Sequence, residues 1–171
     1  MAETKDQPQN PQGPQGQGAQ SQGAPMQIAV GAQYVKDLSF ESPNAPQVFA
    51  PTQSQPEINL GVNVHTRNLA ERNFEVLLAL RLEAKLDGKL AFIAELAYGG
   101  VFALPPMPED QMRVMLLVEC PRILFPFARQ VLMSAVRDGG FPHIMVAPID
   151  FGALYLANKD KIGSMPTAGA A

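Results

Sequence analysis

Cysteine and histidine, the side chains best suited to nucleophilic catalysis with a general base, are few in this sequence. Cys120 is the only cysteine, and His65 and His143 are the only histidines. A cysteine becomes an effective nucleophile when a neighbouring histidine takes up the thiol proton, so a small enzyme built on Cys120 and either histidine is one hypothesis. The strongly apolar stretch around Cys120 instead favours a buried, unreactive thiol.

The rest of the sequence adds no second catalytic or cofactor-binding pattern. No serine has the Gly-x-Ser-x-Gly context of a nucleophile elbow, and neither a GxxxxGKS/T loop nor a GxGxxG loop is present to bind phosphate. No second metal ligand lies at helical or zinc-finger spacing from His143. We therefore predict a protein that is not an enzyme and that has neither a metal site nor a cofactor.

Composition and charge limit the classes of partner. The 171-residue chain has a formal net charge of -3 and an isoelectric point of about 5.3, so its electrostatic field does not favour nucleic acid or an anionic membrane. Apolar residues make up 46% and charged residues 17%, a low charge density that hints at self-association. The sequence has no secretory signal and no run of about 18 apolar residues. We expect a cytoplasmic protein without membrane insertion.

The composition changes near residue 27 and again near residue 160. Residues 1–27 are rich in Gln, Pro and Gly and cannot bury enough apolar surface to offset chain ordering. We predict that they form a disordered tail, which serves as a spacer or, alternatively, as a recognition segment. Residues 161–171 are predicted to be a flexible C-terminal tail. Residues 28–160 are long enough to form one domain with its own core.

Alternation of apolar and polar side chains predicts four β-strands in the first part of this domain. The first strand has Ile28, Val30, Ala32, Tyr34, Leu38 and Phe40 on one face and Gln33, Asp37, Ser39 and Glu41 on the other. The other three strands are predicted at 57–65, 74–86 and 90–98. The four prolines Pro43, Pro46, Pro51 and Pro56 exclude a regular strand between the first two and predict a long crossover loop.

Two features stand out in the last pair of strands. The Asp87-Gly88 pair between them predicts a type I′ hairpin, because both turn positions need positive φ. The second face of the fourth strand, where Ile93 and Ala97 flank Glu95, is less polar than a solvated face usually is. That face needs a further explanation, such as contact with a partner.

After residue 99 the pattern changes to helical spacing. Pro108, followed by two acidic residues, predicts the start of a helix. Because Pro121 and Pro126 interrupt, the longest helix is predicted at 126–138, and a last short helix follows with Asp150 as its N-cap. Strands followed by helices predict an α+β fold, with helices packed on one face of a four-stranded antiparallel sheet.

Six short segments form an ordered set of motifs. They are residues 36–46, 55–57, 99–102, 120–129, 141–142 and 147–155. In this order they resemble the SecB protein-export chaperone family, and the most specific of them are the first-strand motif and the Cys-Pro-Arg-Ile-Leu-Phe-Pro-Phe run that begins at Cys120. The resemblance covers about residues 28–158. Family members commonly carry a tryptophan where this chain has Ser54.

The resemblance implies a function and an assembly. SecB proteins are homotetramers, dimers of dimers, that bind unfolded preproteins without ATP, keep them competent for translocation and deliver them to the SecA motor. The long helices lie between two sheets in such tetramers, whereas an ordinary monomer core is the alternative for their apolar sides. A second function within the same fold is a SecB-like chaperone dedicated to a toxin–antitoxin pair.

The resemblance also assigns two binding surfaces. SecA is expected to bind the outer sheet face at Asp37, Glu41, Ile93 and Glu95, where the alternative is an ordinary solvated strand face. Unfolded clients are expected to bind an apolar groove, because apolar side chains accept many sequences. The predicted groove residues are Val48, Phe49, Ile58, Leu60, Phe102, Phe151 and Tyr155. The alternative for each of them is a place in the domain core.

Overall fold

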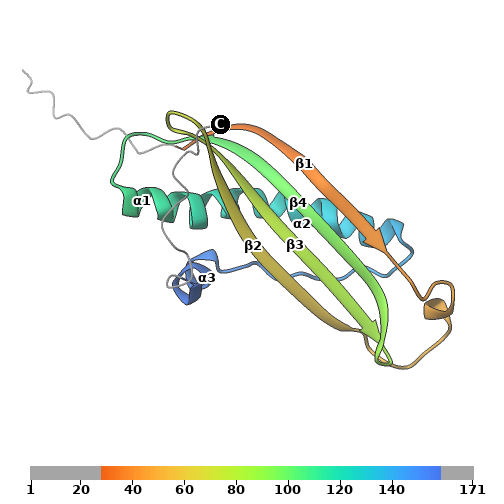
Figure 1. Cartoon of the computed structure of the whole chain (residues 1–171). Helices are drawn as coiled ribbons and strands as arrows, with labels where there is room; N and C mark the ends of the chain where they lie inside the picture. Colours follow the sequence, from red (N-terminus) through yellow and green to blue (C-terminus); the bar gives the residue numbers. More distant parts are fainter. Residues whose placement is uncertain (1–27, 159–171) are drawn as a thin grey trace, which may run out of the picture.

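Four antiparallel strands form one sheet in residues 28–158, the part of the chain that the computed structural model describes (Figure 1). They are β1 (Ala29–Glu41), β2 (Glu57–Ala70), β3 (Asn73–Leu86) and β4 (Lys89–Ala103). The order across the sheet is β1-β4-β3-β2, so β1 and β2 are the edges. This arrangement confirms the predicted α+β fold. The tails predicted at 1–27 and 161–171 lie outside the described residues.

The β3–β4 hairpin turns at the predicted Asp-Gly pair. Asp87 has φ 51° and Gly88 has φ 74°, which are the positive values that a type I′ turn requires. From this turn the two strands pair along their whole length, from Leu86 opposite Lys89 to Asn73 opposite Ala103. The even-numbered residues of both strands are buried on one face, from Phe74 to Ala84 and from Phe92 to Phe102.

A long helical segment covers that buried face. It consists of α1 (Glu109–Val114), a π-helical stretch η2 (Met115–Glu119) and α2 (Cys120–Asp138), which follow one another without a break (Figure 1). Leu124, Leu132 and Val136 of α2 are at most 1% exposed. No helix of residues 28–158 covers the opposite face of the sheet, which we call the outer face (Figure 1).

The start of the longest helix differs from the prediction. Pro121 occupies one of the first two positions of α2, and Pro126 lies inside the helix, although a helix start near Pro126 was expected. An interior proline costs about 3 kcal/mol, whereas each fully buried Leu or Val contributes about 1.5–3 kcal/mol. The burial of Leu124, Leu132 and Val136 therefore outweighs the broken hydrogen bond. None of the helices within residues 28–158 is long and apolar enough to cross a membrane.

The last helix, α3 (Phe151–Asn158), follows an extended segment that runs back from the end of α2 (Figure 1). The backbone N–H of Ala153 donates a hydrogen bond of 2.9 Å to Oδ1 of Asp150, which confirms Asp150 as the N-cap. Phe151 is 1% exposed, and its ring meets the Phe125 ring edge-on at a centroid distance of 6.0 Å. This aromatic contact joins α3 to α2.

Two irregularities in β1 change the predicted faces of that strand. Its pairing with β4 shifts register between Val30 and Gln33 and again between Val35 and Asp37. As a result, Tyr34 lies opposite Gly99 on the outer face, while Gln33 lies opposite Gly100 on the helix-covered face, the reverse of the simple alternation. An extra residue in one strand inverts the faces on either side of it, and the sequence pattern does not reveal where such a residue sits.

We predict that Gly99→Ala destabilises the fold. A Cβ at Gly99 would lie 2.8 Å from two ring carbons of Tyr34 and 3.1 Å from a methyl carbon of Leu77, so the ring would have to move. Overpacking of this kind costs about 1–3 kcal/mol. The free energy of unfolding in urea, measured at one protein concentration, checks the effect.

Gly61→Ala is the matched control for this prediction. Gly61 also lies in a strand on the outer face, but a Cβ there would meet only Arg81, at 3.7 Å and beyond. We expect this variant to be neutral or stabilised by about 0.5–1 kcal/mol. Equal free energies of unfolding for the two variants would contradict the packing argument.

Candidate functional site

Strands β1 and β4 bring the four predicted SecA-binding residues together on the outer face. Asp37 lies opposite Ala97, Glu41 lies opposite Ile93, and Ser39 lies opposite Glu95. Directly opposed residues of an antiparallel pair point to the same face of the sheet. We call Asp37, Glu41, Ile93 and Glu95 the acidic strip; its first two members are exposed and the other two are partly exposed.

The carboxylates of the acidic strip differ in their partners. Glu95 forms a hydrogen-bonded ion pair with Arg81 of β3, and this bond raises the pKa of Arg81 above its ordinary value. Both side chains are about half exposed, at 49% and 46%, so water screens the pair. Within residues 28–158, neither Asp37 nor Glu41 forms an ion pair. These two carboxylates are therefore available to a basic partner.

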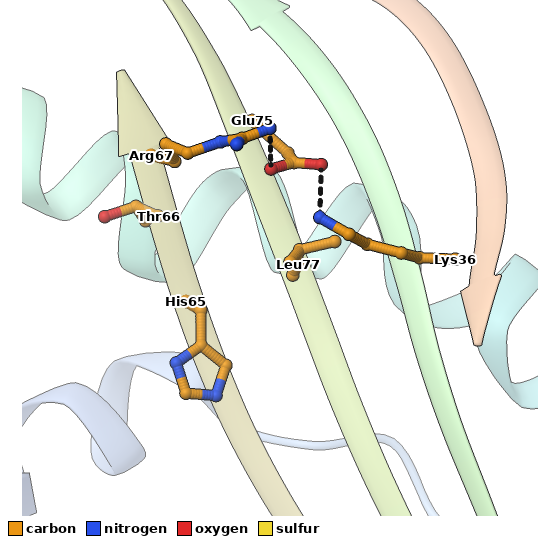
Figure 2. A pocket seen from close by; sticks show the side chains of 6 residues that line it. All are labelled: Lys36, His65, Thr66, Arg67, Glu75 and Leu77. Atoms are coloured by element: carbon orange, nitrogen blue, oxygen red, sulfur yellow. Dashed lines mark hydrogen bonds and ion pairs between the residues drawn. The ribbon is translucent and has the colours of Figure 1, made fainter. Parts of the chain in front are cut away.

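A second polar cluster lies beside the strip on the same face. Figure 2 shows the Glu75 carboxylate of β3 approached from opposite sides by Lys36 and Arg67. Lys36 Nζ lies 3.0 Å from Oε1, and Arg67 Nη2 lies 3.0 Å from Oε2. The Tyr34 hydroxyl donates a further hydrogen bond to Oε1. The side chain of Glu75 is only 4% exposed, so these donors replace its hydration.

The donors around Glu75 shift its acidity. The hydrogen bond from Tyr34, and then the positive charges of Lys36 and Arg67, hold the pKa of the Glu75 carboxyl below its ordinary value, against the opposing effect of burial. The same hydrogen bond, together with burial and the negative charge of Glu75, raises the pKa of Tyr34. At neutral pH the carboxylate is ionised and the phenol keeps its proton, which is the state that this cluster requires.

Two of the predicted groove residues are core residues. Phe102 is 0% exposed and Phe151 is 1% exposed, and both belong to the main apolar core. Phe102 points toward the helices from the inner strand β4, and Phe151 packs on Phe125. These two side chains therefore lie in the core, which was the alternative interpretation.

Val48 and Phe49 lie in the crossover loop, on a short helix η1 (Gln47–Phe49). The Phe49 ring is 49% exposed and lies 5.0 Å from the ring of Phe141, which lies 4.7 Å from Phe92 and 6.1 Å from Phe40. We call Phe40, Phe49, Phe92 and Phe141 the aromatic cluster. Its outer member offers an apolar surface to a partner.

The crossover loop is held in place by polar side chains. The Ser42 hydroxyl and the Asn44 amide each donate a 2.8 Å hydrogen bond to a carbonyl of β4, at Ala91 and Leu90. At the other end of the loop, Ser54 Oγ bonds the Asp87 carboxylate of the hairpin turn. Ser54, which replaces the tryptophan common in the family, thus anchors the loop and provides no aromatic surface.

The remaining predicted groove residues lie apart from the aromatic cluster. Ile58 and Leu60 share the helix-side face of the edge strand β2, and Ile58 is 40% exposed. Tyr155 lies on α3, which packs against η2 before the first turn of α2. Phe141 follows the last turn of α2, and a 19-residue helix is about 28 Å long. The predicted residues therefore form separate apolar sites along the domain.

A hollow that the sequence did not predict lies between α2 and the extended segment after it. It has a volume of about 510 Å³ and is lined by Arg129, Met133, Ile144, Met145 and others. Met145 is 89% exposed, and Arg129 Nη1 donates a 3.2 Å hydrogen bond to the Val146 carbonyl. The alternation of Ile144 and Val146 with exposed residues was the available signal for an extended segment here.

The thiol of Cys120 is separated from both histidines. Cys120 is 0% exposed, and burial together with the charge of Glu119 raises its pKa to about 12. His65 is exposed on the outer face of β2, opposite Leu77, and His143 is exposed after α2. The buried, unreactive thiol is therefore the interpretation that the structure favours.

Comparisons with known proteins agree with the motifs. The family described as preprotein translocase subunit SecB matches residues 20–161. A protein-export protein SecB of Rhodopseudomonas palustris is 51% identical over 138 residues, which cover 81% of this chain and 87% of the relative. A Bradyrhizobium protein of the same name is 49% identical over 147 residues, which cover 85% of this chain and 91% of the relative.

A solved structure has a similar fold despite low sequence identity. It is the Mycobacterium tuberculosis Rv1957 SecB-like chaperone in complex with a ChAD peptide from the Rv1956 HigA1 antitoxin. The similarity has a TM-score of 0.60 at 10% identity and covers 71% of this chain and 90% of the other. Because the family matches most of the chain and relatives share about half of its residues, the chain belongs to the SecB family of protein-export chaperones.

Proposed function

We propose that this chain binds unfolded preproteins in the cytoplasm without ATP, keeps them competent for translocation and delivers them to the SecA motor. The observation that carries this proposal is the acidic strip, in which two carboxylates without an ion-pair partner in residues 28–158 lie beside a partly exposed isoleucine on the outer face. Relatives that share about half of this sequence are named protein-export protein SecB, which supports the export role.

SecA docking is proposed to use the acidic strip as a receptor for a basic segment. By the family resemblance, SecA carries a basic, zinc-bearing tail that suits such a surface. Charged groups at an interface steer association, and apolar contacts hold the complex. Ile93 lies opposite Glu41 and supplies the apolar contact among the acids. Because no helix of the described residues covers the outer face, that face offers room for this partner.

Client binding is proposed at the separate apolar sites. Phe49 and the aromatic cluster form one site, and Ile58 with Leu60 on β2 forms another. Each site is small and accepts many sequences, so several sites that act on one unfolded chain bind it more tightly than any one of them does. Within residues 28–158, β2 pairs only with β3, and its other edge is proposed to add backbone hydrogen bonds to an extended client segment.

Assembly into a homotetramer, a dimer of dimers, is proposed from an apolar surface that is exposed in the described part of the chain. Val30, Val35 and Leu38 on the helix side of β1 are 41%, 45% and 43% exposed, and Phe127 on α2 is 48% exposed. We call these four residues the apolar flank. Contiguous exposed apolar residues mark contact surfaces, and Leu38 and Phe127 line one hollow together with Tyr98. The low charge content of the chain also favours self-association.

A chaperone dedicated to a toxin–antitoxin pair is the alternative function. It would prefer one antitoxin over diverse unfolded proteins. The acidic strip is the surface that SecA docking needs, so the presence of Asp37, Glu41 and Glu95 favours export.

The export proposal predicts holdase activity. At a stoichiometric ratio, the protein is expected to delay the folding of a slowly folding precursor in the absence of ATP, because apolar segments of the client stay bound. The recovery of precursor fluorescence over time measures this delay. The export proposal fails if the precursor folds as fast with the protein as without it. Tight binding of one antitoxin with no effect on diverse clients would support the alternative.

Glu95→Lys is expected to weaken SecA binding by at least about tenfold, a free-energy change of about 1.4 kcal/mol. The new lysine repels a basic partner and also faces Arg81, the present partner of Glu95. Titration calorimetry with SecA measures the loss, and the affinity for an unfolded client is expected to stay nearly unchanged.

Glu71→Lys is the control for this charge reversal. Glu71 lies in the turn between β2 and β3, and its side chain is 88% exposed. Its replacement makes the same change in net charge away from the strip, and we expect SecA binding to be unaffected. Equal loss of SecA and client binding in Glu95→Lys would show that Glu95 is a structural residue.

The assembly proposal predicts a native mass of four times 18.4 kDa. Light scattering at micromolar concentration measures this mass. Phe127→Glu is expected to lower it, because the substitution places a charge in the apolar flank without touching the core. A wild-type protein of 18.4 kDa under the same conditions would contradict the proposed tetramer.

A further inference from the structure

We infer that Glu75 is a positioning residue for the acidic strip, because it fixes the irregularity in β1 that directs Asp37 to the outer face. The inference rests on the proposed docking function of the strip. Glu75 does not belong to the strip and lies on β3, two strands away from β1 in the sheet. Its effect on docking would therefore be exerted through β1.

The irregularity is a β-bulge at Lys36. Val35 lies opposite Tyr98 and Asp37 lies opposite Ala97, so β1 advances by two residues where β4 advances by one. Lys36 is the extra residue and has no partner of its own in β4. Through this bulge, Tyr34 and Asp37 both point to the outer face although they are separated by an odd number of positions.

Both halves of β1 need this bulge. If regular alternation continued from Tyr34, Leu38 and Phe40 would point to the outer face and Asp37 would point toward the helices. Phe40 would then leave the ring of Phe92, on which it stacks at 5.6 Å. The strip exists because the strand changes phase between its two halves.

The second half of β1 is fixed by packing and by its link to β4. Phe40 belongs to the aromatic cluster, and its ring lies so close to the end of α2 that a Cβ at Gly139 would overlap it. The Ser42 hydroxyl bonds the Ala91 carbonyl just beyond the strand. Glu41 lies between these two attachments, so its position is held without Glu75.

The first half of β1 is fixed by Glu75. Tyr34 and Lys36 reach across β4 to the same carboxylate oxygen, and they stand immediately before the bulge and in it. Gly99 of β4 leaves the space in which the Tyr34 ring crosses. Arg67 of β2 holds the other carboxylate oxygen from the far side (Figure 2). Asp37, the next residue after the bulge, therefore depends on Glu75.

Glu75→Gln tests this inference, because the amide keeps the size of the side chain and loses the charge that binds Lys36. We expect SecA affinity to fall by about fivefold, about 1 kcal/mol, because Asp37 is then no longer held at its place in the strip. In a double-mutant cycle, Asp37→Asn should have little further effect in the Glu75→Gln background, whereas Glu41→Gln should have its full effect.

Amide hydrogen exchange supplies a readout that does not depend on SecA. In Glu75→Gln we expect faster exchange at residues 33–37 of β1 and unchanged exchange at 38–41. Arg67→Gln is the matched control, because it removes an ion pair of the same carboxylate from β2 and leaves the two β1 contacts in place. This control should alter neither β1 exchange nor SecA affinity.

The outcomes separate the two proposals. If Asp37→Asn and Glu41→Gln both leave SecA affinity unchanged, the docking proposal fails, while the exchange data still test the bulge. If Glu75→Gln changes neither β1 exchange nor the effect of Asp37→Asn, the positioning role is wrong. Should Glu75→Gln fail to fold, Tyr34→Phe decides, because it removes one hydroxyl from the cluster and keeps the ring over Gly99; unchanged exchange at 33–37 would then overturn the inference.

Discussion

The apolar faces of β3 and β4 pack against α2, and this contact divides the domain into two unlike faces. Every even-numbered residue of β3 from Phe74 to Ala84 is buried, so the helical segment has no freedom to move to the other side of the sheet. The odd-numbered residues are consequently directed to the outer face, which no helix between residues 28 and 158 covers. A single packing event thus creates both the stability of the domain and the surface that the acidic strip occupies.

The sequence predicted the local features that short-range chemistry determines. The Asp87-Gly88 turn requires positive φ, the Asp150 cap satisfies a free backbone N–H, and the alternation of β3 matches a strand with one buried face. The prediction that the longest helix starts near Pro126 was wrong, because the free energy gained by burying α2 is a tertiary effect that proline spacing does not report. The predicted sheet faces of Gln33 and Tyr34 were wrong for a similar reason, since the position of a bulge is determined by contacts with a distant strand.

The shared face of the four strip residues was easier to predict than the burial of the proposed groove residues. Asp37, Glu41, Ile93 and Glu95 alternate with apolar residues on their own strands, so only the pairing of β1 with β4 was needed to bring them together. The groove residues have no such signal, because a phenylalanine in a strand or helix looks the same whether it ends in the core or at the surface. Phe102 is fully buried and Phe49 is half exposed, and this difference depends on which elements cover each ring.

The two proposed binding surfaces lie on opposite faces of the sheet at β1 and β4. Phe40 and Phe92 belong to the aromatic cluster, while the next residue of each strand, Glu41 and Ile93, belongs to the acidic strip. Side chains of successive strand residues point to opposite faces, so SecA and a client could occupy the same protomer without a steric conflict. These residues share two paired backbones, which link the strip directly to the aromatic cluster. The proposed docking and client surfaces are therefore joined through the paired ends of β1 and β4.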